Sequence, residues 1–250
     1  MTLYQGMEKT ELLLKGAGKF GISLTQNQEG KFFKYMELLK EWNSKVNLTS
    51  IEEDNDIILK HFIDSLSIMP CIKTYIDSIK NKNISLIDVG TGAGFPGIPV
   101  KIAYNEINMV LLDSLSKRIK FLNEVISQLG LEGIKSVHSR AEDSGMNVEY
   151  REKFDISVAR AVSSLPVLLE YCLPFVKVEG LFIAMKGSDA TEIDTCKNAL
   201  DILGGKIEEV INFQLPFSDI KRNIIIIKKF RHTSSKYPRK AGKPSKEPLL

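Results

Sequence analysis

The sequence has few cysteines and no long apolar run. Cys71, Cys172 and Cys196 are odd in number and far apart among the 250 residues. This pattern argues against a disulfide framework or a metal site, so we expect buried thiols and a cytoplasmic protein. No apolar run approaches the roughly 18 residues of a membrane span. The first residues also lack the basic stretch and apolar core of a signal peptide, and we expect no membrane partner.

A strong overall charge is also missing, because the formal net charge is only +3. The charge is nevertheless uneven: residues 228–250 carry eight basic side chains and one acidic, so the preceding body is mildly acidic. A basic tail on an acidic body indicates a polyanionic partner, most often nucleic acid. Pro238, Pro244 and Pro248 make regular structure unlikely there, so we expect an extended segment that follows a phosphate backbone. The alternatives are a disordered solubilising tail and a tail that packs against the body near the site and closes over it.

Glycine is concentrated in one stretch, residues 83–99, which reads NISLIDVGTGAGFPGIP. Its apolar, β-branched start predicts a strand, and the residues after Pro96 predict a helix. A glycine loop between strand and helix lets the backbone approach an adenosine-containing ligand. Residues 92–97 fit the dinucleotide pattern G-x-G-x-x-G. Residues 88–94 instead resemble the D-x-G-x-G-x-G loop of class I methyltransferases. Asp88 favours the second reading, because its carboxylate would lie beside the ligand and repel a pyrophosphate.

Residues 1–80 are predicted to be helical. We expect a helix over 7–19, a second one that begins after a capping box at Thr25–Gln28, and a third from about Asp54 to Pro70. Strands and helices then alternate, which predicts a parallel sheet covered on both faces. The strands are expected at 84–89, 108–113, 134–139, 154–159, 180–185, 206–214 and 223–230, and the helices at 96–104, 115–129, 163–175 and 189–203.

The last two strands are joined by about eight residues. A parallel crossover needs a dozen or more, so this pair is predicted to be an antiparallel hairpin. That ending is typical of a class I S-adenosylmethionine-dependent methyltransferase, and not of a dinucleotide dehydrogenase. We therefore predict an α/β, Rossmann-like fold with a mostly parallel seven-stranded sheet and an antiparallel last strand. The predicted units are a helical extension over 1–80, the core over 81–230 and the basic tail over 231–250.

Several polar residues follow the predicted strands at the edge where open α/β sheets bind ligands. Asp113 ends the second strand and could accept both ribose hydroxyls of adenosine, or cap the next helix. Ala141 and Glu142 follow the third strand, facing the adenine, unless this is an ordinary exposed turn.

His61 and Asp64 could share a helix face, as a structural pair or as a wall of the site.

Arg160 directly follows the fourth strand, and Lys186 follows the fifth. The Asn/Asp-Pro-Pro-aromatic motif of enzymes that methylate exocyclic amines is absent there. A ring nitrogen with an in-plane lone pair, such as guanine N7, needs no base, and near-attack positioning alone can contribute about 7–11 kcal/mol. Arginine can offer a bidentate pair to guanine O6 or to phosphate. We take Arg160, Arg140 and Lys186 as catalytic candidates.

The chain resembles the glucose-inhibited division protein B family, the guanine-N7 methyltransferases of small-subunit ribosomal RNA. The resemblance covers nearly the whole chain and rests on motifs in family-like order: residues 42–49, 61–65, 89–99, 113–118, 139–142, 159–161, 186–187 and 237–244. It implies cofactor-site positions at Gly90, Phe95, Ala141, Glu142 and Arg160. It makes Arg118, Arg140 and Arg160 candidates for RNA contact or catalysis.

The sequence thus predicts methyl transfer from S-adenosylmethionine to guanine N7 in 16S ribosomal RNA, without a covalent intermediate. We expect the RNA or the small ribosomal subunit as partner, a monomer and no metal. The cofactor residues are predicted to be Gly90, Gly92, Gly94, Phe95, Asp113, Ala141, Glu142 and Arg160, and the RNA contacts Arg118, Arg140, Arg239, Lys240 and Lys243. The alternatives are a non-catalytic adenosine-ligand-binding regulator that contacts RNA and, third, an NAD-linked oxidoreductase.

Overall fold

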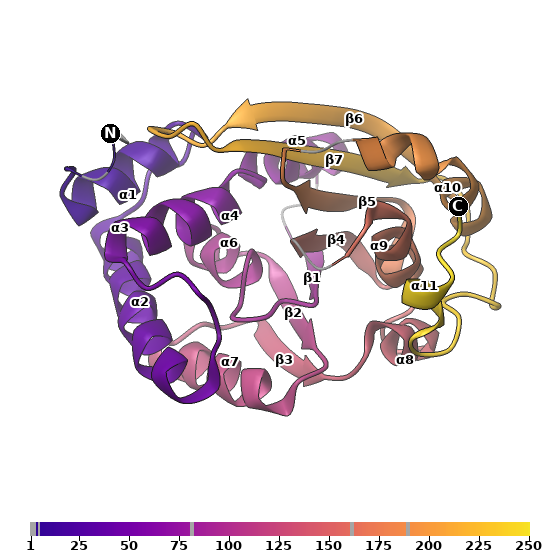
Figure 1. Ribbon diagram of the computed structural model, residues 1–250, viewed down its shortest axis with the longest axis horizontal. Coiled ribbons are helices and arrows are strands. Elements are labelled where there is room, and N and C mark those ends of the chain that lie inside the picture. The colour runs from indigo at the N-terminus through magenta and orange to yellow at the C-terminus, as the bar shows by residue number, and fades with distance from the viewer. Residues whose placement is uncertain (1–3, 5, 81–82, 161–162, 189–190) are drawn as a thin grey trace.

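The computed structural model describes residues 4, 6–80, 83–160, 163–188 and 191–250. Its centre is a seven-stranded sheet of order β3-β2-β1-β4-β5-β7-β6 (Figure 1). The strands are β1 Ser85–Val89, β2 Asn108–Asp113, β3 Ile134–His138, β4 Phe154–Arg160, β5 Val176–Lys186, β6 Gly205–Gln214 and β7 Lys221–Lys229.

Strands β1 to β5 run parallel, and β7 is antiparallel to both of its neighbours, β5 and β6. The predicted hairpin and fold class are therefore confirmed. The strand order reverses between β1 and β4, which is the place where open α/β sheets leave a crevice at the carboxyl ends of their strands. β1 and β4 carry the glycine loop and Arg160 at those ends.

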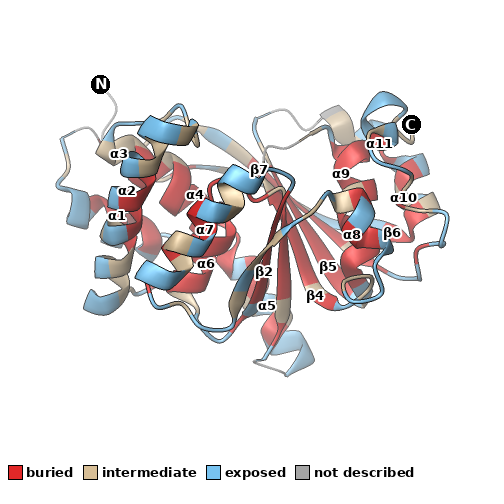
Figure 2. Ribbon diagram, turned by 90° about the horizontal axis from the view of Figure 1, so that it is seen from below, coloured by how far each residue is buried: buried red, intermediate tan, exposed pale blue. Residues whose placement is uncertain are grey.

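Helices cover both faces of the sheet (Figure 2). On one face lie α1 Lys9–Gly18, α2 Gln26–Val46, α5 Met69–Ile79, α6 Gly97–Ala103, α7 Ser116–Gln128 and a continuous helix made of α3 Asp54–Ile57, the π-helical η1 Ile58–Ile63 and α4 Asp64–Leu66. On the other lie α8 Ala141–Met146, α9 Leu165–Cys172, η2 Leu173–Phe175, η3 Thr191–Thr195, α10 Lys197–Leu203 and α11 Lys243–Lys246. None of the helices in the described ranges is long and apolar enough to cross a bilayer.

Two apolar clusters form the core, because successive strand residues point to opposite faces of the sheet. Leu86 joins the cluster under the N-terminal helices, and Ile87 joins the cluster under α9 and α10. The N-terminal helices therefore share one core with the sheet. The three cysteines are buried, and burial raises the pKa of the Cys71 thiol to about 11, as expected of structural thiols.

Several predicted boundaries were wrong. The third helix ends at Leu66, and Pro70 lies in the first turn of a separate helix, α5, where its missing N–H costs nothing. β5 begins at Val176 instead of residue 180. The predicted helix 189–203 divides into η3 and α10, and its first two residues lie outside the described ranges. The capping box is confirmed, with Thr25 Oγ1 accepting from the Gln28 backbone N–H at 3.3 Å.

The C-terminal segment, residues 231–250, was expected to be extended, but the structure shows the alternative in which it packs against the body. It packs along α8, α9 and α10 and includes the short helix α11 (Figure 1). Arg151 fixes it by donating to the carbonyl oxygens of Thr233 at 2.7 Å and Tyr237 at 2.7 Å. The prolines and charges of this segment suggest an extended chain. The residues that hold it, such as Arg151 and Glu170, lie far away in the sequence and could not be recognised as its partners.

Candidate functional site

The glycine loop follows β1 and is held by backbone hydrogen bonds to the neighbouring strand. The N–H of Gly90 donates to the Leu112 carbonyl oxygen at 2.8 Å, and the N–H of Gly92 donates to Asp113 Oδ2 at 2.9 Å. Gly92 has a φ of +63°, and a Cβ there would meet no atom within 4 Å. The loop therefore leaves open space beside its backbone. At Gly94 a Cβ would lie 2.5 Å from Ile98, so glycine is required there for packing.

The sequence suggested that the Asp88 carboxylate would lie beside a ligand, but Asp88 lines neither of the two pockets described below. Its side chain is fully buried, and Oδ2 accepts from Thr91 Oγ1 at 2.7 Å and from the Gly97 N–H at 2.8 Å. Burial raises the pKa of Asp88 to about 6, and the two hydrogen bonds oppose that rise. The role of Asp88 is to fix the loop from below.

A cavity of about 340 Å³ opens at the carboxyl ends of β1, β2 and β3, and we call it the glycine-loop pocket. Gly90, Asp113, Ala141 and Glu142 line it, together with Arg140 and Gly242. Ala141 and Glu142 begin α8, a helix that the sequence had not indicated. Four of the predicted cofactor positions are therefore brought together here, from three separate strand ends.

Each oxygen of the Asp113 carboxylate is held by a hydrogen bond within the protein. Oδ1 accepts from the Leu115 N–H at 2.9 Å, just before α7, and Oδ2 accepts from the glycine loop. Arg118 adds an ion pair at 3.3 Å. The carboxylate is almost fully buried yet lines the pocket, so it is a rigid acceptor for ligand donors. Together with Glu142 it makes this pocket suited to hydroxyl and amino groups and unsuited to a pyrophosphate.

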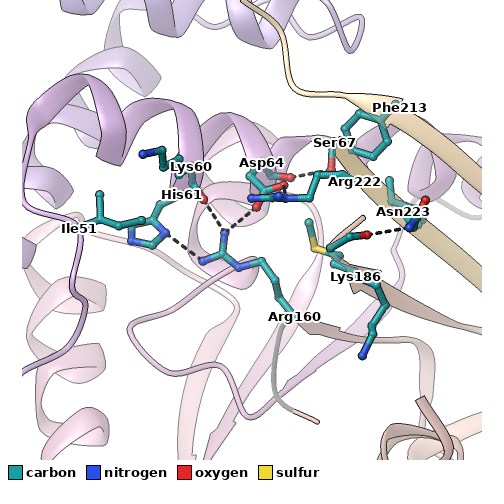
Figure 3. A pocket seen from close by; sticks show the side chains of 13 residues that line it. Ile51, Lys60, His61, Asp64, Ser67, Arg160, Lys186, Phe213, Arg222 and Asn223 are labelled. Atoms are coloured by element: carbon teal, nitrogen blue, oxygen red, sulfur yellow. Dashed lines mark hydrogen bonds and ion pairs between the residues drawn. The ribbon is translucent and has the colours of Figure 1, made fainter. Parts of the chain in front are cut away.

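A second cavity of about 360 Å³ lies beyond β4, and we call it the arginine pocket (Figure 3). Arg160 extends into it from the end of β4, with Nη1 donating to the Lys60 carbonyl oxygen at 3.1 Å. The guanidinium carbon lies 4.9 Å from the centre of the Phe95 ring, in a cation–π arrangement. Ile51, Met185 and Phe213 supply apolar wall. The pocket thus combines a planar cation with surfaces on which a flat ring can pack.

His61 is held in one tautomer within this pocket. Its Nδ1 lies 3.2 Å from Arg160 Nη2, and because an arginine only donates, Nδ1 must accept. Nε2 therefore carries the proton and donates to Thr49 Oγ1 at 2.8 Å. Burial, and then the positive charge of Arg160, lower the pKa of His61 to about 3. His61 is thus uncharged at neutral pH and stacks on Phe95 with ring centres 4.4 Å apart.

Asp64 lies between two arginines. Its Oδ2 pairs with Arg160 at 3.3 Å and its Oδ1 with Arg222 Nε at 3.1 Å. Sequence reasoning missed Arg222, which stands near the start of β7, just before Asn223 and four isoleucines. One signal in the sequence could have indicated Arg222: a charged side chain close to a run of buried apolar residues needs a partner of opposite charge. Asp64 holds both guanidinium groups at the pocket wall.

The structure separates the predicted site residues into groups. Arg160 and Lys186 line the arginine pocket, whereas Arg140 lines the glycine-loop pocket. Lys186 points away from the other side chains in Figure 3 and pairs with Glu192 at 2.9 Å. Phe95 is buried beneath Arg160 and lines neither cavity. Of the motif at 159–161, residue 161 lies outside the described ranges.

The predicted RNA contacts of the C-terminal segment also separate. Lys240 is exposed, and Lys243 makes only an exposed pair with Glu247 at 3.6 Å. Arg239 instead pairs with the buried carboxylate of Glu170 at 2.6 Å. Its charge is used inside the protein.

Comparison with known proteins gives a consistent result. A family described as rRNA small subunit methyltransferase G matches residues 28–225. The ribosomal RNA small subunit methyltransferase G of Acetivibrio thermocellus is 65% identical over 239 residues, which cover 96% of each chain. The protein of the same name from Alkaliphilus oremlandii is 52% identical, over 97% of this chain and 100% of its own length.

Solved structures resemble the fold at low sequence identity. A mutant of MtNAS superposes with a TM-score of 0.51 at 14% identity and covers 82% of this chain and 75% of its own. TrmN from Thermus thermophilus gives a TM-score of 0.50 at 12% identity, over 69% of this chain and 53% of its own. These likenesses support the Rossmann-like architecture alone.

Proposed function

Because the chain belongs to the rRNA small subunit methyltransferase G family, we propose that it methylates N7 of a guanine in 16S ribosomal RNA. It is an S-adenosylmethionine-dependent methyltransferase, as the family and the fold indicate together. The observation that carries the choice of base is the pairing of an acceptor-lined pocket with an arginine-lined one at the same sheet edge.

The glycine-loop pocket fits S-adenosylmethionine. Gly90 lines the pocket, the open space beside Gly92 in the same loop admits a ligand against the backbone, and Asp113 is placed to accept from ribose hydroxyls. Ala141 and Glu142 are the candidates for the adenine, by small size and by a carboxylate acceptor. When bound, S-adenosylmethionine supplies an activated methyl group on a sulfonium. The protein's contribution is to bind and orient it through the strand ends that line this pocket.

The arginine pocket is our candidate site for the guanine. Three of the five N–H groups of Arg160 bond to Lys60, Asp64 and His61, and the other two suit guanine O6 or a phosphate. The apolar wall suits a flat base. Guanine N7 uses its in-plane lone pair and releases no proton, so no base is required. His61, with its pKa lowered to about 3, is uncharged and serves as a packing and acceptor group. Catalysis then rests on positioning, which can contribute about 7–11 kcal/mol.

The RNA is proposed to extend from the pockets over exposed cations. Arg140 stands at the start of α8, and Lys240 and Lys243 lie on the C-terminal segment. Arg118 is half-buried against Asp113 and would contact RNA only at the rim. We further propose that the protein acts in the cytoplasm as a monomer. Residues 1–80 are then part of the RNA-facing wall, through Ile51 in the connection before α3 and His61 in η1.

The test is transfer of a tritiated methyl group from S-adenosylmethionine to small ribosomal subunits from a strain that lacks the gene. Digestion to nucleosides should place the label in 7-methylguanosine. Subunits from the parent strain are the matched control and should accept little label, because their site is already filled. Label in another nucleoside would refute the assignment of guanine N7, and the absence of transfer would refute the assignment of the pockets.

A further inference from the structure

The C-terminal segment contributes directly to the glycine-loop pocket. Gly242 forms part of the pocket wall, and its backbone N–H donates to Glu142 Oε1 at 2.8 Å. Glu142 is only 8% exposed, so this hydrogen bond restricts how its carboxylate can turn. Residues 100 positions apart in the chain thus share one wall of the pocket.

An ion pair fixes the segment three residues earlier. Glu170 on α9 is fully buried, and it accepts from the Arg239 backbone N–H at 2.7 Å and from Nη2 at 2.6 Å. The Nε of Arg239 adds bonds of 2.9 and 3.1 Å to the two carboxylate oxygens. A buried carboxylate with this many charge-assisted bonds is a rigid anchor. Only two residues separate Arg239 from Gly242, so a shift of Arg239 should also move Gly242 and the pocket wall.

We propose that the C-terminal segment completes the cofactor pocket and that Arg239 and Gly242 are positioning residues for S-adenosylmethionine. Arg239 anchors the segment on Glu170, and the Gly242 N–H then holds Glu142 in the orientation that receives the adenine. This inference rests on the proposed function of the glycine-loop pocket. It assigns Arg239 to the cofactor and not to RNA.

The first test compares two glycine substitutions. Gly242 has a φ of +81° and Gly130 has a φ of +55°, and a Cβ at either would meet no atom within 4 Å. Gly242→Ala and Gly130→Ala therefore introduce similar backbone strain. Only at Gly242 should relief of that strain displace the backbone N–H that donates to Glu142. We expect calorimetry to show S-adenosylmethionine affinity lowered fivefold or more in Gly242→Ala and changed less than twofold in Gly130→Ala.

The second test removes the anchor. The double variant Arg239→Gln with Glu170→Gln avoids an unpaired buried charge and loses the ion pair. Arg231→Gln is the matched control. Arg231 lies in the same segment and pairs with the exposed Asp201 of α10 at 3.4 Å. We expect the KM for S-adenosylmethionine to rise fivefold or more in the double variant, with kcat at saturating cofactor and the KM for RNA within twofold. The control should match the parent.

Melting curves will show that each variant is folded at the assay temperature. Parent-like cofactor affinity in both Gly242→Ala and the double variant would overturn the inference while leaving the proposed function intact. Equal losses in the test variants and their controls would also overturn it, because they would report general destabilisation. A parent protein that does not bind S-adenosylmethionine would refute the proposed function, and this inference with it.

Discussion

The glycine-loop pocket and the arginine pocket share one edge of the sheet but are assembled differently. The first is lined mainly by residues directly after β1, β2 and β3, and its hydrogen bonds join adjacent strands. The second is formed by a π-helical turn, β4, β5 and β7. The two arginines that pair with Asp64, Arg160 and Arg222, are 96 and 158 positions away from it in the chain. In the first pocket the strand-end residues are set by local backbone geometry and only the wall at Gly242 comes from far along the chain, whereas the second pocket depends throughout on distant segments meeting correctly.

This comparison predicts that the two pockets can be disabled separately. The largest effect should come from Arg160→Gln, which removes the guanidinium fork while Asp64 keeps its pair with Arg222. We expect methyl transfer to fall about 10²–10³-fold, as when one preorganised donor is removed from an active site. Cofactor affinity should change less than twofold. Single-turnover transfer and calorimetry on the same preparation will measure both quantities.

Arg160→Lys is the matched control for charge, because it keeps the cation but not the bidentate geometry. Its rate should recover only in part. If Arg160→Gln loses cofactor affinity as strongly as it loses turnover, the two pockets are one site. Arg160 would then belong to the cofactor, as the family resemblance allows.

The converse variant is Asp113→Ala in the glycine-loop pocket. Loss of an ionised acceptor should weaken S-adenosylmethionine binding by about 1.5–3 kcal/mol. Turnover at saturating cofactor should stay near that of the parent, since Asp113 lies away from the arginine pocket. Calorimetric titration measures the affinity. A loss below about half a kcal/mol would leave Asp113 with only its structural bonds to Gly92 and Leu115, below the range for hydrogen bonds to charged groups.

The arginine pocket should also show a pH dependence of stability. The pKa of His61 falls from 6.5 in the unfolded chain to about 3 in the folded protein. As the pH drops below 6.5 the unfolded chain gains a proton that the native state does not, so the free energy of unfolding decreases until about pH 3. Between pH 7 and pH 5 this loss amounts to about 2 kcal/mol.

Urea unfolding of His61→Gln at pH 7 and pH 5 will test this, because the variant should lose about 2 kcal/mol less than the parent over that interval. His138→Gln, at an exposed histidine, should keep the parent's loss. Equal pH dependence in His61→Gln and the parent would mean that His61 titrates alike in both states. Burial and the charge of Arg160 would then not lower the pKa of His61 in the folded protein.

The smallest effect concerns the surface between the pockets and the RNA. The double variant Lys240→Gln with Lys243→Gln should flatten the plot of log RNA affinity against log salt by about 1.4, if both side chains meet single-strand phosphates. Cofactor affinity should be unaltered. Filter binding at several salt concentrations measures the slope. An unchanged slope would remove these lysines from the RNA-binding surface.

Predictability from sequence followed the same division. The glycine loop, Asp113 and the final hairpin could be predicted because each depends on a few consecutive residues. The pairing of Asp64 with Arg222 could not, since no local pattern specifies which distant cation reaches a buried acid. The role of Arg239 was missed for the same reason. One signal was available: Glu170 lies in the apolar run LPVLLEYC, and a carboxylate buried there requires a partner.

The π-helical turn Ile58–Ile63 carries His61 and the Lys60 carbonyl that Arg160 contacts. Such a turn holds one more residue than a regular helix, and it commonly arises at functional sites. Deleting a single residue from it would restore regular winding, which needs one residue fewer for the same number of turns. The side chains after the turn would keep their directions, but the turn could no longer present both His61 and the Lys60 carbonyl to Arg160. In this segment, insertions and deletions should be less tolerated than any point change, because the count of residues, and not only their identity, sets the site.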